Sequence, residues 1–379
     1  TCASGDGTTP WPMRIDRLEL SGFRNYQDQA ADFDPGCNVI FGENAQGKTN
    51  LLEAIACLST GRSPRARSDR EMIRFEADSA LLRASVSARE RNFMLETRLQ
   101  RGRPKKMTVN GVPVRRGAQS SGVLFTVYFC PEDLYLIRDG AAARRKFMDT
   151  ALCQLRPKYA EALARYNKAY ESKTRILLDS EERPDLLAAL PEFNHQMALA
   201  GAAVIHYRAR FAARLAEYAE ASHQECSGGR ETLALRYETV KTVTNPFADL
   251  PTVSSQLEEH QKEHEHAERA ARLCLSGPHK DDLAVLIGGV SAKSYSSQGQ
   301  TRTAALSIKL AEREIYKNTV GEYPVLLLDD VLSELDARRQ EFVLNRIQGG
   351  QVFITCCEDD RLETLLKGKV FHIQGGHVV

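Results

Sequence analysis

Alternating hydrophobic and polar residues mark the first third of the chain as rich in strands. Residues 93–99 alternate with a period of two, which is typical of a half-buried strand. The apolar run at 37–41 precedes a glycine loop, and a helix is predicted at about 48–58. Asn110-Gly111 between two apolar runs predicts a hairpin with a tight turn. Residues 13–130 are therefore expected to form an α/β core with an added antiparallel layer.

Helical periodicity dominates from residue 131 to about residue 275. Helices are predicted at 156–178, 192–225 and 253–275, with prolines between them. No heptad pattern runs unbroken for many repeats, which excludes a long coiled-coil arm. We interpret 131–275 as a mainly helical domain inserted into an α/β domain that resumes at 276–379.

Charge and composition narrow the class of protein. The 379 residues contain 51 Lys and Arg against 50 Asp and Glu, a net charge of +1 that excludes histone-like binding through bulk charge. Hydrophobic residues make up 42% and charged residues 27%, which is globular composition. No apolar run approaches the roughly 20 residues that span a membrane. Residues 1–12 lack a signal-peptide pattern and are expected to form a disordered leader.

The cysteines and histidines favour neither a disulfide framework nor a zinc site. The nine cysteines include no C-x-x-C pair and lie mostly in apolar runs, as expected of reduced thiols in a cytoplasmic protein. His260, His264 and His266 stand in a strongly charged stretch, which we interpret as a solvated helix face.

The strongest chemical signal is a G-x-x-x-x-G-K-[ST] motif between the predicted strand at 37–41 and the following helix. It consists of Gly42, Glu43, Asn44, Ala45, Gln46, Gly47, Lys48 and Thr49, and Asn50 follows it. Such a loop points backbone N–H groups into one concavity at a helix N-terminus, which binds phosphate. Lys48 would neutralise the β- and γ-phosphates of ATP, and the Thr49 hydroxyl would ligate Mg²⁺. The alternative is a chance turn before a helix.

A second signal is the apolar run 325–328, typical of a strand inside a parallel sheet, which ends in Asp329 and Asp330. This is the Walker-B arrangement. Asp329 would hold Mg²⁺, and Asp330 would orient or deprotonate the attacking water. The alternative is a buried strand whose first loop residues happen to be acidic.

Two shorter patterns lie near these carboxylates. Residues 296–300, with Ser297 before a predicted helix, resemble the signature motif of ABC-type ATPases, and 333–336 matches the D-loop. Each motif by itself is equally a helix cap, since Ser297 and Asp336 are good N-cap residues. Their order and spacing relative to Lys48 and Asp329 favour the ATPase interpretation.

Further stretches resemble the RecF family of the SMC/Rad50/RecF group. They cover residues 20–26, 129–134, 277–283, 297–302 and 327–336. The resemblance implies a P-loop ABC-type ATPase head, with a parallel sheet core and an antiparallel layer, that carries an inserted helical domain. It also implies a cytoplasmic DNA-repair ATPase that forms a homodimer in the presence of ATP, on double-stranded DNA at single-strand/double-strand junctions. RecR and RecO would be its partners in loading recombinase, and DNA would stimulate its weak ATPase activity.

The same resemblance assigns roles to single residues and exposes departures. Ser297 matches the signature serine that covers the nucleotide of the other subunit, and Arg24 and Asn25 match a position that approaches the nucleotide. The alternative for Arg24 is a solvated charge at a strand end. Asp330 stands where many ABC ATPases have Glu, so slow hydrolysis is expected.

Three further departures fall in other motifs. Gln298 replaces the first signature glycine, Cys130 occupies the place of a Q-loop glutamine, and Thr355 or Cys356 stands where a switch His is expected.

A DNA surface must be local, because the overall charge is close to neutral. Residues 62–118 hold fifteen Lys and Arg against six Asp and Glu, a net charge of +9. The candidates are Arg62, Arg65, Arg67, Arg101, Arg103, Lys105 and Lys106. With a single Trp in the chain, this pattern favours contact with the phosphates of duplex DNA over base stacking. The alternative is an ordinary surface with clustered charges.

Three other functions are alternatives to a DNA clamp gated by ATP. A transporter subunit is disfavoured by the 280 residues between Lys48 and Asp329, and a structural SMC-like tether by the short helices. An adaptor that binds nucleotide without turnover remains an alternative.

Overall fold

The computed structural model describes residues 12–114, 122–357 and 368–379, so the predicted leader lies outside the described residues except for Pro12. The chain divides into two compact units, Thr1–Pro131 with Arg313–Val379, and Glu132–Glu312. The second boundary differs from the expected one at residue 275. It lies later because β10 (Asp282–Ile287) pairs antiparallel with β9 (Leu233–Glu238), which keeps this stretch in the second unit.

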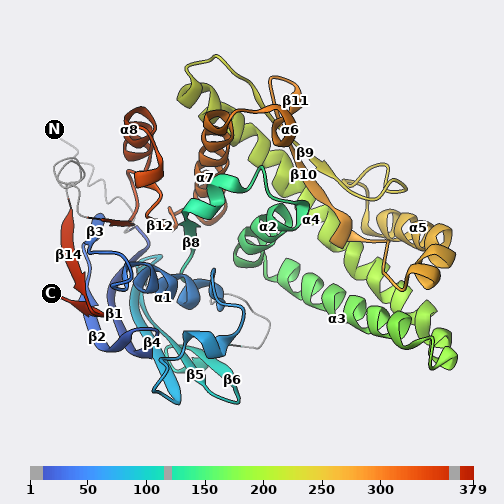
Figure 1. Ribbon diagram of the computed structural model, residues 1–379, viewed down its shortest axis with the longest axis horizontal. Coiled ribbons are helices and arrows are strands. Elements are labelled where there is room, and N and C mark those ends of the chain that lie inside the picture. Colours follow the sequence, from blue (N-terminus) through green and yellow to red (C-terminus); the bar gives the residue numbers. More distant parts are fainter. Residues whose placement is uncertain (1–11, 115–121, 358–367) are drawn as a thin grey trace, which may run out of the picture. The chain divides into compact units, whose positions relative to one another are not determined.

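A mainly parallel sheet forms the centre of the first unit, in the order β15-β14-β3-β13-β12-β8 (Figure 1). Its strands are β3 (Cys37–Phe41), β8 (Thr126–Phe129), β12 (Val325–Asp329), β13 (Val352–Cys356), β14 (Lys369–Gln374) and β15 (His377–Val378). Every residue of β12 and β13 is buried, because both faces of this part of the sheet are covered. The unit also contains α1 (Lys48–Thr60) and α8 (Ala337–Arg346).

A second, antiparallel sheet with the order β2-β1-β4-β5-β6-β7 supplies the predicted added layer. Its strands are β1 (Arg14–Phe23), β2 (Tyr26–Asp32), β4 (Ser79–Ala88), β5 (Arg91–Gln100), β6 (Arg103–Val109) and β7 (Val112–Pro113). Asn110 and Gly111 have φ of 51° and 78°, so the predicted tight turn joins β6 to β7.

One buried glutamine joins the two sheets. The side-chain amide of Gln351, at the start of β13, donates to the carbonyls of Ile15 and Asp34, both at 2.8 Å. Its Oε1 accepts from the backbone N–H of Ile15 at 2.7 Å, and the side chain is fully buried. Because the β1–β2 ladder begins only at Arg17, this amide supplies the partners that the Ile15 backbone lacks on that side.

The second unit is mainly helical, as predicted. It contains α2 (Ala141–Leu155), α3 (Pro157–Asp179), α4 (Leu190–Ser227), α5 (Leu250–Ala271), α6 (Ala292–Tyr295) and the first part of α7 (Gln298–Val320). β9, β10 and β11 (Val290–Ser291) form a small antiparallel sheet. Short 3₁₀ helices lie at Asp69–Met72, Pro131–Tyr135, Pro184–Ala189, Pro278–Lys280 and Leu332–Glu334. No helix in the described ranges is long and apolar enough to cross a membrane.

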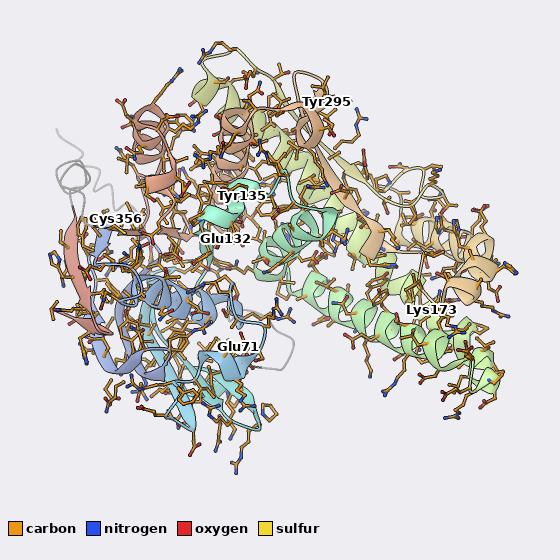
Figure 2. All side chains as sticks on the ribbon, in the orientation of Figure 1. Glu71, Glu132, Tyr135, Lys173, Tyr295 and Cys356 are labelled. Carbon is orange, nitrogen blue, oxygen red and sulfur yellow. The ribbon has the colours of Figure 1, made fainter. Side chains whose placement is uncertain are left out.

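Buried ion pairs fix the segment that carries the Gly277–Leu283 motif. Arg208 of α4 bonds to Asp281 at 2.9 Å and to Asp149 of α2 at 2.8 Å, and it is only 3% exposed. Lys173 of α3, labelled in Figure 2, forms a second buried pair with Glu268 of α5 at 2.5 Å. Each charge has a partner, as buried charges require. Through Asp281, the motif is attached to α4 and, by way of Arg208, to α2.

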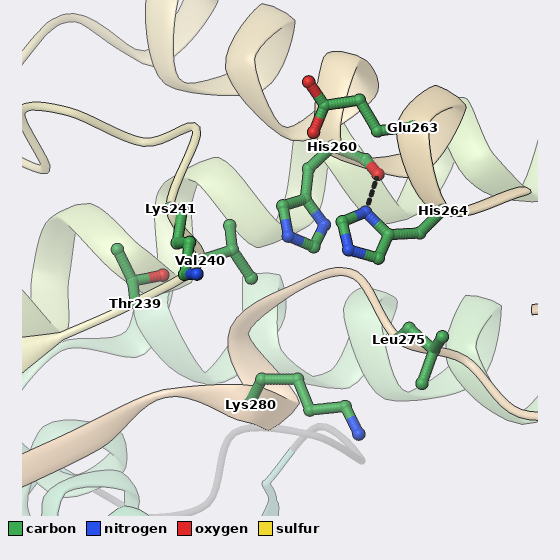
Figure 3. A pocket seen from close by; sticks show the side chains of 8 residues that line it. All are labelled: Thr239, Val240, Lys241, His260, Glu263, His264, Leu275 and Lys280. Carbon is green, nitrogen blue, oxygen red and sulfur yellow. Dashed lines mark hydrogen bonds between the residues drawn. The ribbon is translucent and has the colours of Figure 1, made fainter. Parts of the chain in front are cut away.

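Interpreting 260–266 as a solvated helix face is wrong for its first histidine. His260 is 8% exposed, bonds to Ser276 Oγ at 2.7 Å and stacks on His264 with ring centroids 4.0 Å apart. It lies on the face of α5 that packs inward with Val253 and Leu257. Both rings line an open cavity of about 390 Å³ (Figure 3). The described residues contain no group of three or more His, Cys, Asp or Glu arranged to hold a metal.

Replacing Gln351 with Leu should destabilise the first unit. The substitution leaves buried backbone groups of β1 without partners, which costs about 2–4 kcal/mol of unfolding free energy in total. Urea unfolding should show this loss, whereas Gln374→Leu on the exposed side of β14 should change stability by less than about 0.5 kcal/mol. Equal effects of the two substitutions would contradict a joining role for Gln351.

Candidate nucleotide-binding site

The predicted phosphate loop connects β3 to α1, and its backbone requires glycine at two positions. Gly42 and Gly47 have φ of 155° and 121°, and Ala45 has φ of 65°. A Cβ atom at Gly42 would lie 2.5 Å from the carbonyl oxygen of Ile373, and one at Gly47 would lie 2.7 Å from Asn25 Nδ2. The loop therefore has the tight path that a phosphate cradle needs.

Side chains from β2 and the turn before it brace this loop. Asn25 Nδ2 donates to the carbonyl of Gln46 at 2.7 Å, and Asn25 Oδ1 accepts from Asn50 Nδ2 at 2.9 Å. The buried hydroxyl of Tyr26 donates to the carbonyl of Gly47 at 3.0 Å, and burial raises the pKa of this phenol. Asn25 thus holds the loop backbone at Gln46. Tyr26 holds it at Gly47, a role that the sequence motifs do not assign.

Lys48 lies inside the loop and is 4% exposed. Its Nζ donates to the carbonyls of Gly42 at 2.5 Å and Glu43 at 3.3 Å. The side chains of Glu43, Asn44 and Ala45 face outward and are exposed. A compact cation held at the loop's centre is what the phosphate interpretation requires.

The two predicted carboxylates lie beside the loop. Asp329 Oδ1 accepts from the Thr49 hydroxyl and from the Thr355 hydroxyl, both at 2.9 Å. Asp329 Oδ2 accepts from the hydroxyl of Tyr128 on β8, and burial raises the pKa of that phenol. The Walker-B aspartate is therefore held by hydroxyl groups from α1, β13 and β8.

Asp330 has the properties of a general base. It follows β12 with φ of 52°, and its Oδ1 is buried without a hydrogen-bond partner among the described residues. Burial raises the pKa of its carboxyl group, Asp329 raises it further, and Lys48 and Thr355 oppose the shift. A partly desolvated carboxylate with one unpartnered oxygen is suited to accept a proton from water.

The donor set fits a magnesium ion. Thr49 Oγ1 lies 2.9 Å from Asp329 Oδ1, and the unpartnered Asp330 oxygen follows in the chain. Hydroxyl and carboxylate oxygens are the ligands that Mg²⁺ prefers beside phosphates. Thr49 and Asp329 are the residues that would hold it, as the sequence predicts.

Arg24 is engaged one helical turn along α1 from Thr49. Its guanidinium donates to the fully buried Glu53 carboxylate at 2.9 and 2.7 Å and to the carbonyl of Glu71 at 2.8 Å. Glu53 also accepts from Ser63 and lies 4.0 Å from Arg65 Nη1. This cluster ties the 61–67 loop to α1, so Arg24 has a structural role in this geometry.

Cys357, next to the two residues expected at the switch position, contacts the lysine. Thr355 contacts Asp329 and Cys356 is buried within β13 (Figure 2), whereas Cys357 Sγ lies 3.5 Å from Lys48 Nζ and 3.2 Å from Asn44 Oδ1. Strand β13 continues to Cys356, and all its residues are buried. The first exposed side chain after the strand is therefore that of Cys357.

The signature residues belong to the second unit, whereas the phosphate loop and both carboxylates belong to the first. Ser297 and Gln300 form a capping box at the start of α7. Gln300 N donates to Ser297 Oγ at 3.2 Å, and Ser297 N donates to Gln300 Oε1 at 2.8 Å. The Ser297 side chain is exposed, and its hydroxyl accepts rather than donates in this cap. Asp336 caps α8 by accepting from Arg339 N at 3.0 Å.

The predicted DNA contacts divide into free and engaged side chains. Arg62, Arg65, Arg67, Arg103 and Lys106 are exposed, although Arg65 reaches Asn50 at 3.4 Å.

Arg101 donates to the carbonyls of Ala77, Arg74 and Phe75, and Lys105 pairs with Asp69 at 2.9 Å. These two are therefore structural in the described geometry, and the exposed members are the better candidates for phosphate contact.

Comparison with known proteins identifies the family of this chain. The family model described as the RecF/RecN/SMC N terminal domain matches residues 14–374. A DNA replication and repair protein RecF of Agathobacter rectalis is 39% identical over 97% of this chain and 99% of its own length. The chain belongs to the RecF family. The RecF of Bacillus subtilis is 38% identical over 97% of this chain and 100% of its own length.

Solved structures of the RecF family match in three dimensions as well. The recombination mediator protein RecF-ATP in the RecFOR pathway superposes with a TM-score of 0.89 at 32% identity and covers 99% of both chains. The α/β ATPase fold predicted from the motifs is thereby confirmed.

Asp330→Asn should separate nucleotide binding from hydrolysis. Loss of a general base should lower kcat about 100-fold or more while ATP binding persists. In the wild type, kcat should fall as pH decreases through a pKa that lies above the ordinary aspartate value of 3.8. Steady-state hydrolysis against pH measures both effects.

The free energy of unfolding should change with pH in the direction opposite to kcat. Because folding raises the pKa of Asp330, the wild-type unfolding free energy decreases as pH rises from 3.8 through the raised value. Asp330→Asn lacks this decrease and should be at least as stable at neutral pH. An Asn variant that hydrolyses ATP normally would exclude Asp330 as the base.

Proposed function

We propose that this protein is an ATP-dependent DNA-repair protein that dimerises when it binds ATP, on duplex DNA beside single-strand gaps. The observation that carries the proposal is the convergence of Lys48, Thr49, Asp329 and Asp330, which come from two distant stretches of the chain. Slow hydrolysis would then release the dimer.

The chain's own residues divide the work of phosphoryl transfer. The loop N–H groups and Lys48 bind and orient the triphosphate, because they place positive charge where phosphate charge lies. Asp330 accepts a proton from the attacking water. Bound Mg²⁺, held by Thr49 and Asp329, supplies electrostatic stabilisation of the phosphate oxygens. A shorter Asp in place of Glu reaches the water less well, which supports slow turnover.

The exposure of the signature serine supports dimerisation. Ser297 is exposed at the N-terminus of α7, where its hydroxyl hydrogen and the positive end of the helix dipole suit an anion. We propose that this surface covers the γ-phosphate bound by a second protomer. ATP then contributes to binding in both protomers, and its loss weakens their association.

The DNA surface is proposed on the exposed basic residues of the first unit. Arg62, Arg67, Arg103 and Lys106 are exposed at loops and at a strand edge. Two copies in a dimer would double this charge, and DNA bound there would favour the dimer and stimulate hydrolysis. RecF relatives act in the RecFOR pathway, so RecR and RecO are the proposed partners in loading recombinase.

Ser297→Arg should preserve ATP binding by the protomer but prevent dimerisation, because a bulky cation blocks the approach to the second nucleotide. Light scattering with ATP should give the mass of a dimer for the wild type and of a monomer for the variant. Lys48→Ala serves as the control that loses nucleotide binding itself. Dimers of Ser297→Arg at saturating ATP would refute the shared site.

Reversing the charge of two exposed residues tests the DNA surface. Arg103→Glu with Lys106→Glu should weaken duplex binding and reduce the slope of log K against log salt by about two per protomer. The matched control is Arg165→Glu with Lys168→Glu, both exposed on α3 in the second unit. A loss confined to the control pair would place the DNA on the helical unit instead.

A further inference from the structure

A hydrogen bond within the helical unit connects the signature motif to the segment after α4. Gln300 Nε2 donates to Glu231 Oε1 at 2.9 Å. Glu231 lies in the short segment between the end of α4 and the start of β9. Sequence reasoning assigned no role to Glu231, because it is 69 residues from its partner and belongs to no motif.

Glu231 determines which way the Gln300 amide points. A carboxylate only accepts hydrogen bonds, so the NH₂ group of Gln300 must face Glu231. The amide oxygen then faces the other way and accepts from Ser297 N at 2.8 Å. With the amide reversed, two oxygens would face each other at Glu231 and two N–H donors would face each other at Ser297.

The opposite side of Glu231 faces a buried histidine. His223, on α4, is fully buried, and its Nε2 lies 3.6 Å from Glu231 Oε2. Burial lowers the pKa of this ring, and Glu231 opposes the shift only in part. The His223 ring therefore limits how far the Glu231 side chain can move, without supplying a competing strong donor.

We infer that Glu231 is a positioning residue for the signature serine. It fixes the Gln300 amide, the amide fixes Ser297 N, and the Ser297 hydroxyl is thereby oriented for the nucleotide of the second protomer. This inference rests on the proposed function, and it adds a coupling between α4 and the ATP-dependent interface. A displacement of the α4 end that breaks the 2.9 Å bond would release the signature without altering the phosphate loop.

Glu231→Gln tests the inference, because it keeps the side-chain size and removes the constraint on the Gln300 amide. The matched control is Glu192→Gln, which weakens a similar bond from Gln196 Nε2 to Glu192 Oε1 at 2.6 Å on the exposed face of α4. For each variant we would measure ATP binding by the protomer, the ATP concentration that gives half-maximal dimerisation, and kcat.

Glu231→Gln should bind ATP like the wild type, yet require roughly tenfold more ATP to dimerise, as expected when a hydrogen bond loses its charged partner. Its kcat should fall by a similar factor while its thermal unfolding temperature falls by no more than about 4 °C, and Glu192→Gln should match the wild type throughout. Glu231→Asp, which retains the carboxylate, should recover part of the loss.

Two results would overturn the inference: wild-type dimerisation by Glu231→Gln, or a parallel loss of ATP binding and thermal stability. Failure of the proposed function itself looks different, because the wild-type protein would then stay monomeric at every ATP concentration.

Discussion

The hydrogen bonds of Asp329 are the interactions on which the nucleotide site depends. Its buried carboxylate accepts hydrogen bonds from the hydroxyls of Thr49, Thr355 and Tyr128, which come from α1, β13 and β8. Burying a carboxylate without donors costs free energy, so the three hydroxyls stabilise the charge of Asp329. The carboxylate in turn holds the three hydroxyls in place. The start of α1, and with it the phosphate loop, is thereby attached to the end of β12.

Sequence patterns located the parts of this site whose residues are close together in the chain. The spacing from Gly42 to Thr49 and the apolar run before Asp329 are local rules, because each reflects one turn or one strand. Tyr26, Tyr128 and Cys357 follow no such rule. They reach the site only because strands far apart in sequence become neighbours, as β8 does beside β12 and β3 beside β13.

The same reason explains the differences in the domain boundary and the basic residues. The strand after residue 277 was correctly predicted. Its pairing with β9, which lies among the helices, cannot be read from the periodicity of the sequence. A count of arginines likewise cannot tell a free guanidinium from Arg24 or Arg101, whose donors are used by a carboxylate or by backbone carbonyls. The density of basic residues in the sequence locates the candidate DNA-binding region. Only the hydrogen bonds of the structure show which of its side chains can still contact phosphates.

Dividing the motifs between two units has an energetic consequence for a switch. The signature motif and the phosphate loop lie in different units, so contacts within the helical unit can alter the signature without altering the loop. With Ser297 held through Gln300 and Glu231, its position depends on the end of α4, a helix of 38 residues. A hydrogen bond between an amide and a carboxylate contributes enough to change a dimerisation constant by roughly tenfold, but too little to unfold the unit. Such a bond can therefore couple the end of α4 to the proposed ATP-dependent dimer interface while the fold stays intact.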